Sequence, residues 1–581
     1  MRRRITDAGT LLKNLQATSQ RRFLTGVLIA TFSILVSAAM TAPFFYSNRA
    51  QPGQVEIRQT KDMGIHLAVM EQFDKVLRSG AVYPRWLPDI NYGYGNAWPN
   101  FYQPGFYYLT SLVYAVTDSW VDTLFVITAL GLFASGLAFY VLARSFFGKL
   151  ASAIAAAVYV LLPYHLLDVF VRGAIPEYLS FVFLPLILCF FYRLGNESRA
   201  RYYAGLGVCY GACLMIHIPI AYLLSYLLII YAVMWSAARR DWRIVVRIGL
   251  GMTVGVLLSA IYWIPAVSEI KYAVETVTTF FQYDNNYVSQ LYADSYGDLL
   301  RATFAIQAAA LLTVITGLVW LRLRGSRSTL TKEWAPPHPG VSHESMWIAM
   351  GALSLFMNLP VSYYVARLIP RINVVAFPYR WLVFVCLFTS LVTGAFVDRL
   401  IRSVREPGRA SRGIRMIRAA VIAVLAVNIG FAARAVVIPS LSSPLITRET
   451  DFLCDTYCPL GAPPAGNLPR TERIVLETGS SEIVEWSPLF RKAEITTDQP
   501  TTARFTTFNF PGWAARVDGE DAEISSDAAG AQLIRLPQGR HTVEISFGST
   551  PARNLGAATS VSGLVLVFIL MLSGRLRRQR P

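Results

Sequence analysis

Apolar runs of about 20 residues recur along this 581-residue chain, separated by short polar or proline-containing segments. An α-helix of that length crosses a hydrocarbon layer of roughly 30 Å. Helices satisfy their own backbone hydrogen bonds, which makes them stable inside such a layer. The runs therefore predict a mainly α, polytopic membrane protein with about twelve spans. They lie at approximately residues 23–44, 119–143, 150–163, 177–194, 202–217, 219–238, 246–264, 302–321, 345–360, 380–398, 418–438 and 555–574.

The distribution of charge predicts the orientation of these spans. More than half of the 53 Lys and Arg residues fall in the two terminal tails and in the alternate loops on their side, whereas most of the 36 acidic residues fall on the opposite side. Basic loops stay in the cytoplasm, so both termini are predicted to be cytoplasmic. The net charge of +17 then indicates contact with anionic lipid headgroups, and it gives no reason to expect nucleic acid.

The first apolar run follows a basic segment and could belong to a signal peptide. Its length of about 22 residues favours an uncleaved first helix instead. The predicted division is a basic cytoplasmic tail (1–22), the first span (23–44), a long outer loop (45–118), a helical membrane core (119–438), an extracytoplasmic β-rich domain (439–553), the last span (554–574) and a second basic tail (575–581).

Alternation of apolar and polar residues appears only in the β-rich domain, at 503–508, 532–536 and 541–547. Such short period-2 segments, separated by turn residues such as Asp518-Gly519, predict a small antiparallel β-sandwich. Cys454 and Cys458 lie in the same outer region and could form a disulfide. The other four cysteines fall inside predicted spans, where a thiol acts as a small apolar filler.

The outer loop 45–118 is far longer than a connection between two helices needs to be. If Lys61 to Leu77 is helical, Asp62 and His66 share a face. Asp62 could act there as a general base on an acceptor hydroxyl, or ligate a divalent cation that neutralises a phosphate. The alternative is a solvated helix start that places Asp62 near the positive end of the helix.

Charged residues also mark the ends of later spans. Arg172 could hold a phosphate by paired hydrogen bonds, and Glu177 could orient Arg172 or bind a metal. Alternatively, Asp168 and Arg172 simply pair across one helical turn. Arg380 either anchors the helix among interfacial aromatics or meets a lipid phosphate.

Aromatic residues of the loop, including Trp86 and Tyr102, could stack on a sugar or fill the core of the loop, and Arg85 is a further candidate for substrate binding. No P-loop, dinucleotide-binding glycine motif, zinc-protease motif or nucleophile elbow occurs in the sequence. These absences argue against an ATP-driven pump, a Rossmann enzyme, a zincin and an α/β-hydrolase.

Several short motifs follow one another along the chain. They are Asp62-x-x-x-His66, Tyr83-Pro84-Arg85-Trp86, Gly93-Tyr94-Gly95, Phe101-Tyr102-Gln103-Pro104, Pro163-Tyr164-His165 with Asp168, Arg172-Gly173 and Glu177, Phe377-Pro378-Tyr379-Arg380-Trp381, and Phe510-Pro511-Gly512-Trp513 with Val517-Asp518-Gly519. Together they resemble bacterial multi-span proteins of the GT-C glycosyltransferase superfamily. The nearest group is the one labelled as membrane proteins related to 6-pyruvoyl-tetrahydropterin synthase. The last two motifs are also similar to a family implicated in sugar decoration of cell-envelope polymers.

The resemblance implies a bacterial cytoplasmic-membrane enzyme that transfers sugar on the outer face. The donor would be a polyprenyl-phosphate-linked sugar, and the acceptor an envelope polysaccharide, lipid or protein. An acidic residue of the first outer loop is essential in that superfamily, and Asp62 stands at the matching position. Many members have a pair of acidic residues in this loop, but here His66 stands where the second acid would be. The resemblance therefore does not imply a particular metal ion. A transporter or flippase, or a non-catalytic assembly scaffold, remains the alternative.

Overall fold

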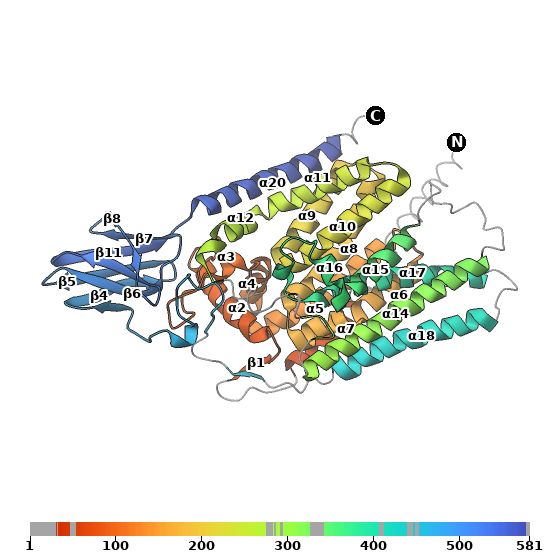
Figure 1. Ribbon diagram of the computed structural model, residues 1–581, viewed down its shortest axis with the longest axis horizontal. Helices are drawn as coiled ribbons and strands as arrows, with labels where there is room; N and C mark the ends of the chain where they lie inside the picture. The colour runs from red at the N-terminus through yellow and green to blue at the C-terminus, as the bar shows by residue number, and fades with distance from the viewer. Residues whose placement is uncertain are drawn as a thin grey trace, which may run out of the picture.

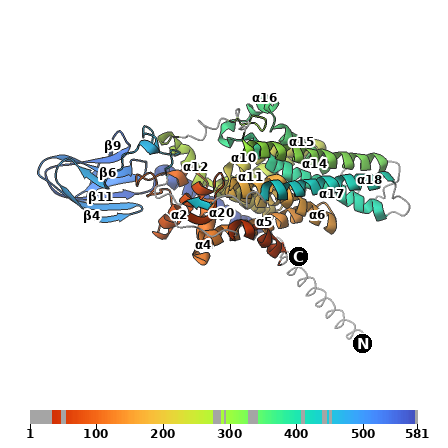
Figure 2. The ribbon, with the colours of Figure 1, turned by 90° about the horizontal axis from the view of Figure 1, so that it is seen from below.

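The computed structural model describes residues 31, 33–46, 54–274, 283, 286–290, 294–325, 342–405, 412–437, 445–447 and 453–576. Long helices run roughly parallel to one another, and a β-domain projects from one end of the bundle (Figure 1). Seen from below, the same elongated arrangement holds, with the β-domain beyond the helices α2 and α4 (Figure 2). The mainly helical class and the β-sandwich-like domain predicted from the sequence are both present.

Each predicted apolar run overlaps a helix, but not every helix is long enough to cross a membrane. Six are long and apolar enough, and nine if each of three bent pairs counts as one span, among the described residues. The predicted count of twelve is therefore not confirmed. The six helices are α5 (Trp120–Ala143), α8 (Ile175–Asn196), α10 (Ile218–Arg239), α14 (Ser295–Gly325), α17 (Leu382–Arg405) and α20 (Pro551–Leu576).

The three bent pairs explain part of the difference in number. They are α6 (Lys149–Leu161) with α7 (Pro163–Leu167) and the π-turn η1 (Asp168–Arg172), α11 (Arg243–Leu258) with α12 (Ala260–Glu269) and η2 (Ile270–Tyr272), and α15 (His343–Phe356) with η5 (Pro360–Ser362) and α16 (Tyr363–Ala366). The first pair bends by 44° at Leu162, which is extended because it precedes Pro163. Among the described residues, the shorter apolar helices are Ser33–Tyr46 and Val421–Arg434. The second runs from α18 (Arg412–Phe431) into η8 (Ala432–Val437), and α9 (Ala200–Ile216) has 17 residues.

The outer loop folds into β1 (Gln54–Arg58) and the helices α2 (Met63–Arg78), α3 (Trp98–Phe101) and α4 (Gly105–Thr117). The helix considered over Lys61 to Leu77 agrees with α2 within two residues at each end. β1 pairs antiparallel with β2 (Leu445–Thr447), which ties the start of the loop to the segment before the β-domain.

The β-domain consists of two antiparallel sheets with strand orders β3-β6-β10-β9 and β4-β5-β11-β7-β8. Asp518 and Gly519 both have positive φ, which is the conformation of the tight turn that joins β7 to β8. Apolar side chains such as Phe505, Ile534 and Ile545 are fully buried in its core. The strands are β3 (Ile474–Leu476), β4 (Ser480–Ser487), β5 (Phe490–Thr497), β6 (Thr501–Phe508), β7 (Trp513–Val517), β8 (Glu520–Ala522), β9 (Ser525–Ser526), β10 (Ala531–Leu536) and β11 (Gly539–Phe547).

Candidate functional site

Three charged residues from two motifs meet in one buried cluster. Arg172 Nη1 lies 3.0 Å from Glu177 Oε1, and Arg380 Nε lies 2.9 Å from Glu177 Oε2. Asp168 Oδ1 is 2.5 Å from Arg172 Nη1, so the pairing across one helical turn also exists. The pair is thus part of a four-residue network of two acids and two bases. Buried charges are stable only when they are paired in this way.

The local backbone explains how Arg172 meets the outer loop. It ends the π-turn η1, an irregularity that is common at functional sites, and Gly173 follows with φ +67°. A Cβ atom at Gly173 would lie 2.0 Å from Thr60 Oγ1, so only glycine permits this close approach. The backbone N–H of Asp62 then donates to the carbonyl of Arg172 over 2.8 Å. The start of α2 is thereby fixed against the arginine.

Asp62 occupies the N-cap position of α2, but its side chain makes no capping hydrogen bond. Its place at the positive end of the helix agrees with the alternative of a helix start, although the side chain is partly buried. Its carboxylate interacts electrostatically with His66 and with the buried phenol of Tyr102. Tyr102 also interacts with Arg380, Glu177 and Arg172. Six of the eight residues expected to bind or act on substrate thus lie in one neighbourhood: Asp62, His66, Tyr102, Arg172, Glu177 and Arg380.

Three further side chains complete the cluster. Tyr164 donates its hydroxyl to Glu177 Oε1 over 2.8 Å, and the Tyr379 ring centroid lies 5.1 Å from the guanidinium of Arg172. His217 Nε2 lies 3.8 Å from Glu177 Oε2. Tyr164, Tyr379 and His217 are not among the site residues predicted from the sequence. His217 had a signal, because an ionisable residue that interrupts an apolar stretch usually has a function.

The two arginines differ in access. Arg172 has 3% of its side chain exposed and Arg380 has 14%. Arg380 is therefore the cation that an incoming anion would meet first, with Arg172 behind it. Glu177 orients both guanidinium groups because each of its carboxylate oxygens faces one of them.

The fit of a divalent cation to this site can be judged from its carboxylates. Glu177 pairs with both arginines. Asp168 pairs with Arg172 through Oδ1 only, and its buried Oδ2 has no hydrogen-bond partner within the described residues, so Asp168 Oδ2 and Asp62 are the carboxylate oxygens of the cluster available for a metal. Within the described ranges, no group of three or more His, Cys, Asp or Glu side chains is arranged to hold a metal ion. The donor set of the cluster does not fit a cation held by protein ligands alone.

His66 is buried, and its Nδ1 lies 3.2 Å from the hydroxyl of Tyr107. Burial lowers the pKa of His66 to about 4, with Asp62 acting to raise that pKa and Arg172 to lower it. The ordinary pKa of histidine is about 6.5, so His66 is neutral at pH 7. At pH values between about 4 and 6.5, His66 is protonated in the unfolded chain but not in the folded protein. The free energy of unfolding therefore falls as the pH drops below about 6.5.

We expect this histidine to make the protein acid-sensitive. Between pH 7 and pH 5, wild type should lose about 2 kcal/mol more free energy of unfolding than His66→Gln, whose side chain does not titrate. Unfolding in mixed detergent micelles at both pH values measures the difference. Equal losses in the two proteins would contradict a buried neutral His66.

Arg85 and Trp86, also expected to bind substrate, lie elsewhere. Trp86 packs against Trp513, with ring centroids 5.6 Å apart, and against Phe547. Gly95 lies so close that its Cβ would meet the Trp86 ring at 2.5 Å. Trp86 therefore joins the loop to the β-domain, which is the core role left open by the sequence.

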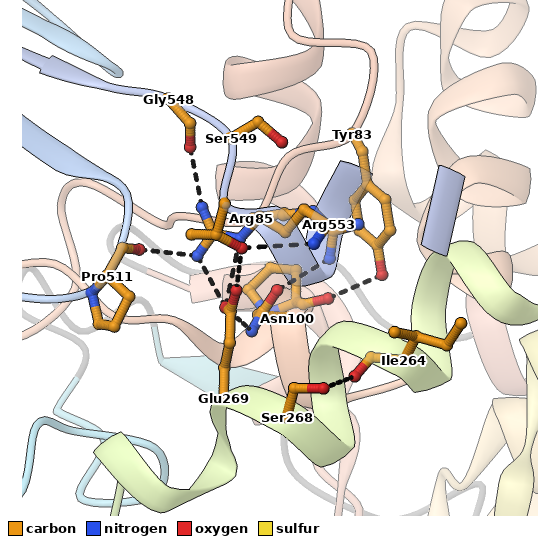
Figure 3. A network of polar contacts seen from close by, with 12 residues as sticks. Tyr83, Arg85, Asn100, Ile264, Ser268, Glu269, Pro511, Gly548, Ser549 and Arg553 are labelled. Atoms are coloured by element: carbon orange, nitrogen blue, oxygen red, sulfur yellow. Dashed lines mark hydrogen bonds and ion pairs between the residues drawn. The ribbon is translucent and has the colours of Figure 1, made fainter. Parts of the chain in front are cut away.

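Arg85 belongs to a second buried network, drawn in Figure 3. Its Nη1 donates to Asn100 Oδ1 over 2.8 Å, and Asn100 Nδ2 donates to Glu269 Oε2 over 2.8 Å. Arg553, at the start of α20, bonds the same Glu269 oxygen at 2.9 Å and the backbone carbonyls of Pro511 and Gly548. One carboxylate on α12 thus connects the outer loop, the last helix and the β-domain.

Replacement of Glu269 by Gln tests whether this network stabilises the position of the β-domain. The amide keeps the shape but loses the charge that Arg553 faces, and hydrogen bonds to charged groups contribute about 1.5–3 kcal/mol. We expect the free energy of unfolding to fall by about that amount and proteolysis between the β-domain and α20 to become faster. Unchanged proteolysis would show that the apolar packing around Trp86 holds the domain without this network.

Cys454 and Cys458 are both free thiols in the structure, so the expected disulfide is absent there. Cys458 Sγ donates to the carbonyl of Cys454 over 3.1 Å and accepts from Asn91 Nδ2 at 3.4 Å. The thiol thus takes part in a local hydrogen-bond network in place of a covalent bond.

Comparison with solved structures finds likenesses to GT-C glycosyltransferases, the superfamily that the sequence motifs resemble. The mycobacterial arabinofuranosyltransferase AftD is 16% identical with a TM-score of 0.46, over 71% of this chain and 27% of that one. The oligosaccharyltransferase AglB of Archaeoglobus fulgidus, in complex with an inhibitory peptide and a dolichol-phosphate, is 14% identical with a TM-score of 0.37, over 72% and 56%. ArnT from Cupriavidus metallidurans, bound to undecaprenyl phosphate, is 14% identical with a TM-score of 0.38, over 71% and 73%.

The chain thus spans about a quarter of AftD and just over half of AglB. At these values the likenesses carry no conclusion about activity, which has to be argued from the site residues. No curated protein matches the sequence. A family model described as a 6-pyruvoyl-tetrahydropterin synthase related domain of membrane proteins matches residues 99–437. Because that match covers more than half of the chain, the protein belongs to the family of 6-pyruvoyl-tetrahydropterin synthase-related membrane proteins.

Proposed function

We propose that this protein is a membrane glycosyltransferase of GT-C type. It moves a sugar from a polyprenyl-phosphate donor to a cell-envelope acceptor on the outer face of the bacterial cytoplasmic membrane. The observation that carries the proposal is the buried cluster in which Glu177 orients Arg172 and Arg380 beside the Asp62 end of α2.

The two guanidinium groups suit a phosphate leaving group. Arginine binds phosphate oxygens by directed hydrogen bonds, and fixed positive charge stabilises the negative charge that develops when a phosphate departs. Arg380 and Arg172 are held in place before any ligand arrives, because Glu177 bonds both of them. They would receive the polyprenyl phosphate as the bond between phosphate and sugar breaks.

Asp62 suits the other half of the reaction. It would accept the proton of the acceptor hydroxyl while that oxygen attacks the anomeric carbon. The new carbon–oxygen bond forms as the bond to the phosphate breaks on the opposite side, which inverts the anomeric centre. His66 is neutral at pH 7 and buried beside Asp62. It would orient the Asp62 carboxylate, and because it carries no positive charge it would not draw the phosphate away from the two arginines.

Two further features support an outer-face location. The more acidic side of the predicted topology carries Asp62, Arg172, Glu177, Arg380 and the β-domain. The cluster also lies where spans begin, since Glu177 is in the first turn of α8 and Arg380 lies two residues before the start of α17. Such an end position favours access by a lipid headgroup over a path through the membrane.

The test is transfer of labelled sugar by the purified full-length protein in liposomes that contain a polyprenyl-phosphate-linked sugar and crude envelope acceptor. We expect labelled acceptor and an equal amount of released polyprenyl phosphate. Movement of the lipid-linked sugar across the bilayer without transfer would replace the proposal by a transport function.

A further inference from the structure

A cleft of about 500 Å³ lies away from the charged cluster, between the β-domain and the segment that precedes it. One wall consists of the turns after β6 and between β9 and β10, and the other consists of residues 459–461 and Tyr272 at the end of η2. Tyr272 is held in this wall by the backbone, because its carbonyl accepts from the N–H of Leu460 at 3.1 Å. The cleft is therefore built from segments far apart in the sequence.

The lining of the cleft is aromatic on some sides and polar on others. Phe510 and Trp513 form its largely buried floor, and Tyr272 presents a ring that is 45% exposed. The one carboxylate in the lining is Asp527, which Arg504 Nε neutralises at 2.6 Å. Aromatic faces next to neutral polar groups suit a ligand that has both an apolar face and hydroxyl groups.

The polar groups of the cleft have remaining hydrogen-bond capacity. Asn509 donates its Nδ2 to Ser526 Oγ over 3.1 Å, which leaves its side-chain carbonyl to accept from a ligand. Ser526 is exposed, and its hydroxyl can donate while its oxygen accepts from Asn509. A hydrogen-bond acceptor and a donor next to an aromatic ring suit a sugar, whose hydroxyl groups donate and accept hydrogen bonds and whose ring has an apolar face.

We propose that this cleft binds a neutral saccharide unit of the acceptor, so that the acceptor is a glycan. The proposal rests on the proposed function only in calling the bound glycan an acceptor; binding itself is independent of catalysis. Among the described residues, the cations beside the lining already have partners: Arg504 pairs with Asp527, and Lys271 Nζ lies 5.0 Å from the centroid of the Tyr272 ring. A neutral ligand is therefore favoured over a phosphate or other anion.

A continuous series of ring contacts connects the cleft to the charged cluster. Tyr102 stacks on Trp98 at 5.2 Å, and Trp98 meets Tyr457 at 5.5 Å. Tyr457 stacks on Phe101 at 5.0 Å, and Phe101 meets Phe510 in the cleft floor at 6.0 Å. These contacts hold the cleft in a fixed position relative to the cluster. A fixed position is needed if the cleft binds one part of a long acceptor while another part reacts at the cluster.

The experiment measures binding with the full-length protein in nanodiscs. The probes are neutral oligosaccharides of increasing length released by mild acid from bacterial envelope polysaccharide, followed by saturation-transfer NMR and titration. Tyr272→Ala removes the exposed ring and Asn509→Ala the acceptor. Tyr364→Ala is the matched control, because that ring is 76% exposed and lies on α16 outside the cleft.

We expect wild type and Tyr364→Ala to bind alike, and Tyr272→Ala and Asn509→Ala to bind roughly tenfold more weakly, which corresponds to about 1.4 kcal/mol. Oligosaccharide binding that is unchanged in both cleft variants would overturn the proposal. So would transfer to a lipid or peptide acceptor with no oligosaccharide binding, a result that leaves the glycosyltransferase function standing. Binding that depends on Tyr272 without any transfer would support the cleft and refute the proposed function instead.

Discussion

Replacing Asp62 by Asn is expected to lower the rate of sugar transfer at least about 100-fold, because a positioned general base contributes 10²–10⁴ in rate. The substitution keeps the size of the side chain and should leave the fold intact, since the structure attaches Asp62 to Arg172 through its backbone N–H. The measurement is the initial rate of transfer from a labelled polyprenyl-phosphate sugar at saturating acceptor. Unfolding is measured on the same preparation.

The matched control is Asp89→Asn in the same outer loop. Asp89 is half exposed and pairs with Lys75 on the surface, so its loss should change the stability by no more than about 0.5 kcal/mol and leave the rate unchanged. A wild-type rate in Asp62→Asn would remove Asp62 from the mechanism. It would leave the arginine cluster to be explained as a structural element.

Replacing Glu177 by Gln should cost about 3–5 kcal/mol of unfolding free energy, the usual effect of leaving a buried charge without its partner. Glu177 is fully buried and faces Arg172 and Arg380 at once. The amide would leave two guanidinium groups with Asp168 as their only acidic neighbour in the network. Unfolding by a strong detergent in mixed micelles measures this loss.

Glu197→Gln is the matched control, because Glu197 caps the opposite end of the same helix, is about half exposed and pairs with Arg199 at 2.5 Å. An exposed pair of this kind contributes about 0–1 kcal/mol. The double variant Glu177→Gln, Arg380→Gln should recover part of the stability lost in Glu177→Gln, since it removes one of the unpaired charges. Additive losses would show that Glu177 acts through packing and not through charge.

Elements whose sequence pattern depends only on near neighbours could be predicted closely. The strands at 503–508, 532–536 and 541–547 lie within β6, β10 and β11, because alternation reports a sheet with one face buried. The apolar runs likewise all overlap helices. The sequence did not give the number of membrane spans. At Leu162 and Ser259 the helix bends although the sequence stays apolar on both sides.

The site was predicted in part, and for a physical reason. Arg172 and Glu177 could be selected because ionisable groups at a membrane edge are costly and so usually have a function. Arg380 could be selected because it stands at the predicted start of a span, and Asp62 because of the motif resemblance and its predicted side of the membrane. Arg85 and Trp86 belong to the same long loop as Asp62 and to the same series of motifs. Their separate location follows from packing against Glu269, Asn100 and the β-domain, which no local pattern reports.

The sequence alone determined that the chain is a helical membrane protein with a β-domain before its last apolar helix, because the length and spacing of apolar residues are local properties. Tertiary structure decided which polar residues share a site. Gly173 permits the close approach that joins Arg172 to the start of α2, and Glu177 brings Arg172 and Arg380 together from positions 208 residues apart in the chain. Such contacts depend on how the helices pack, and packing depends on every neighbouring side chain at once.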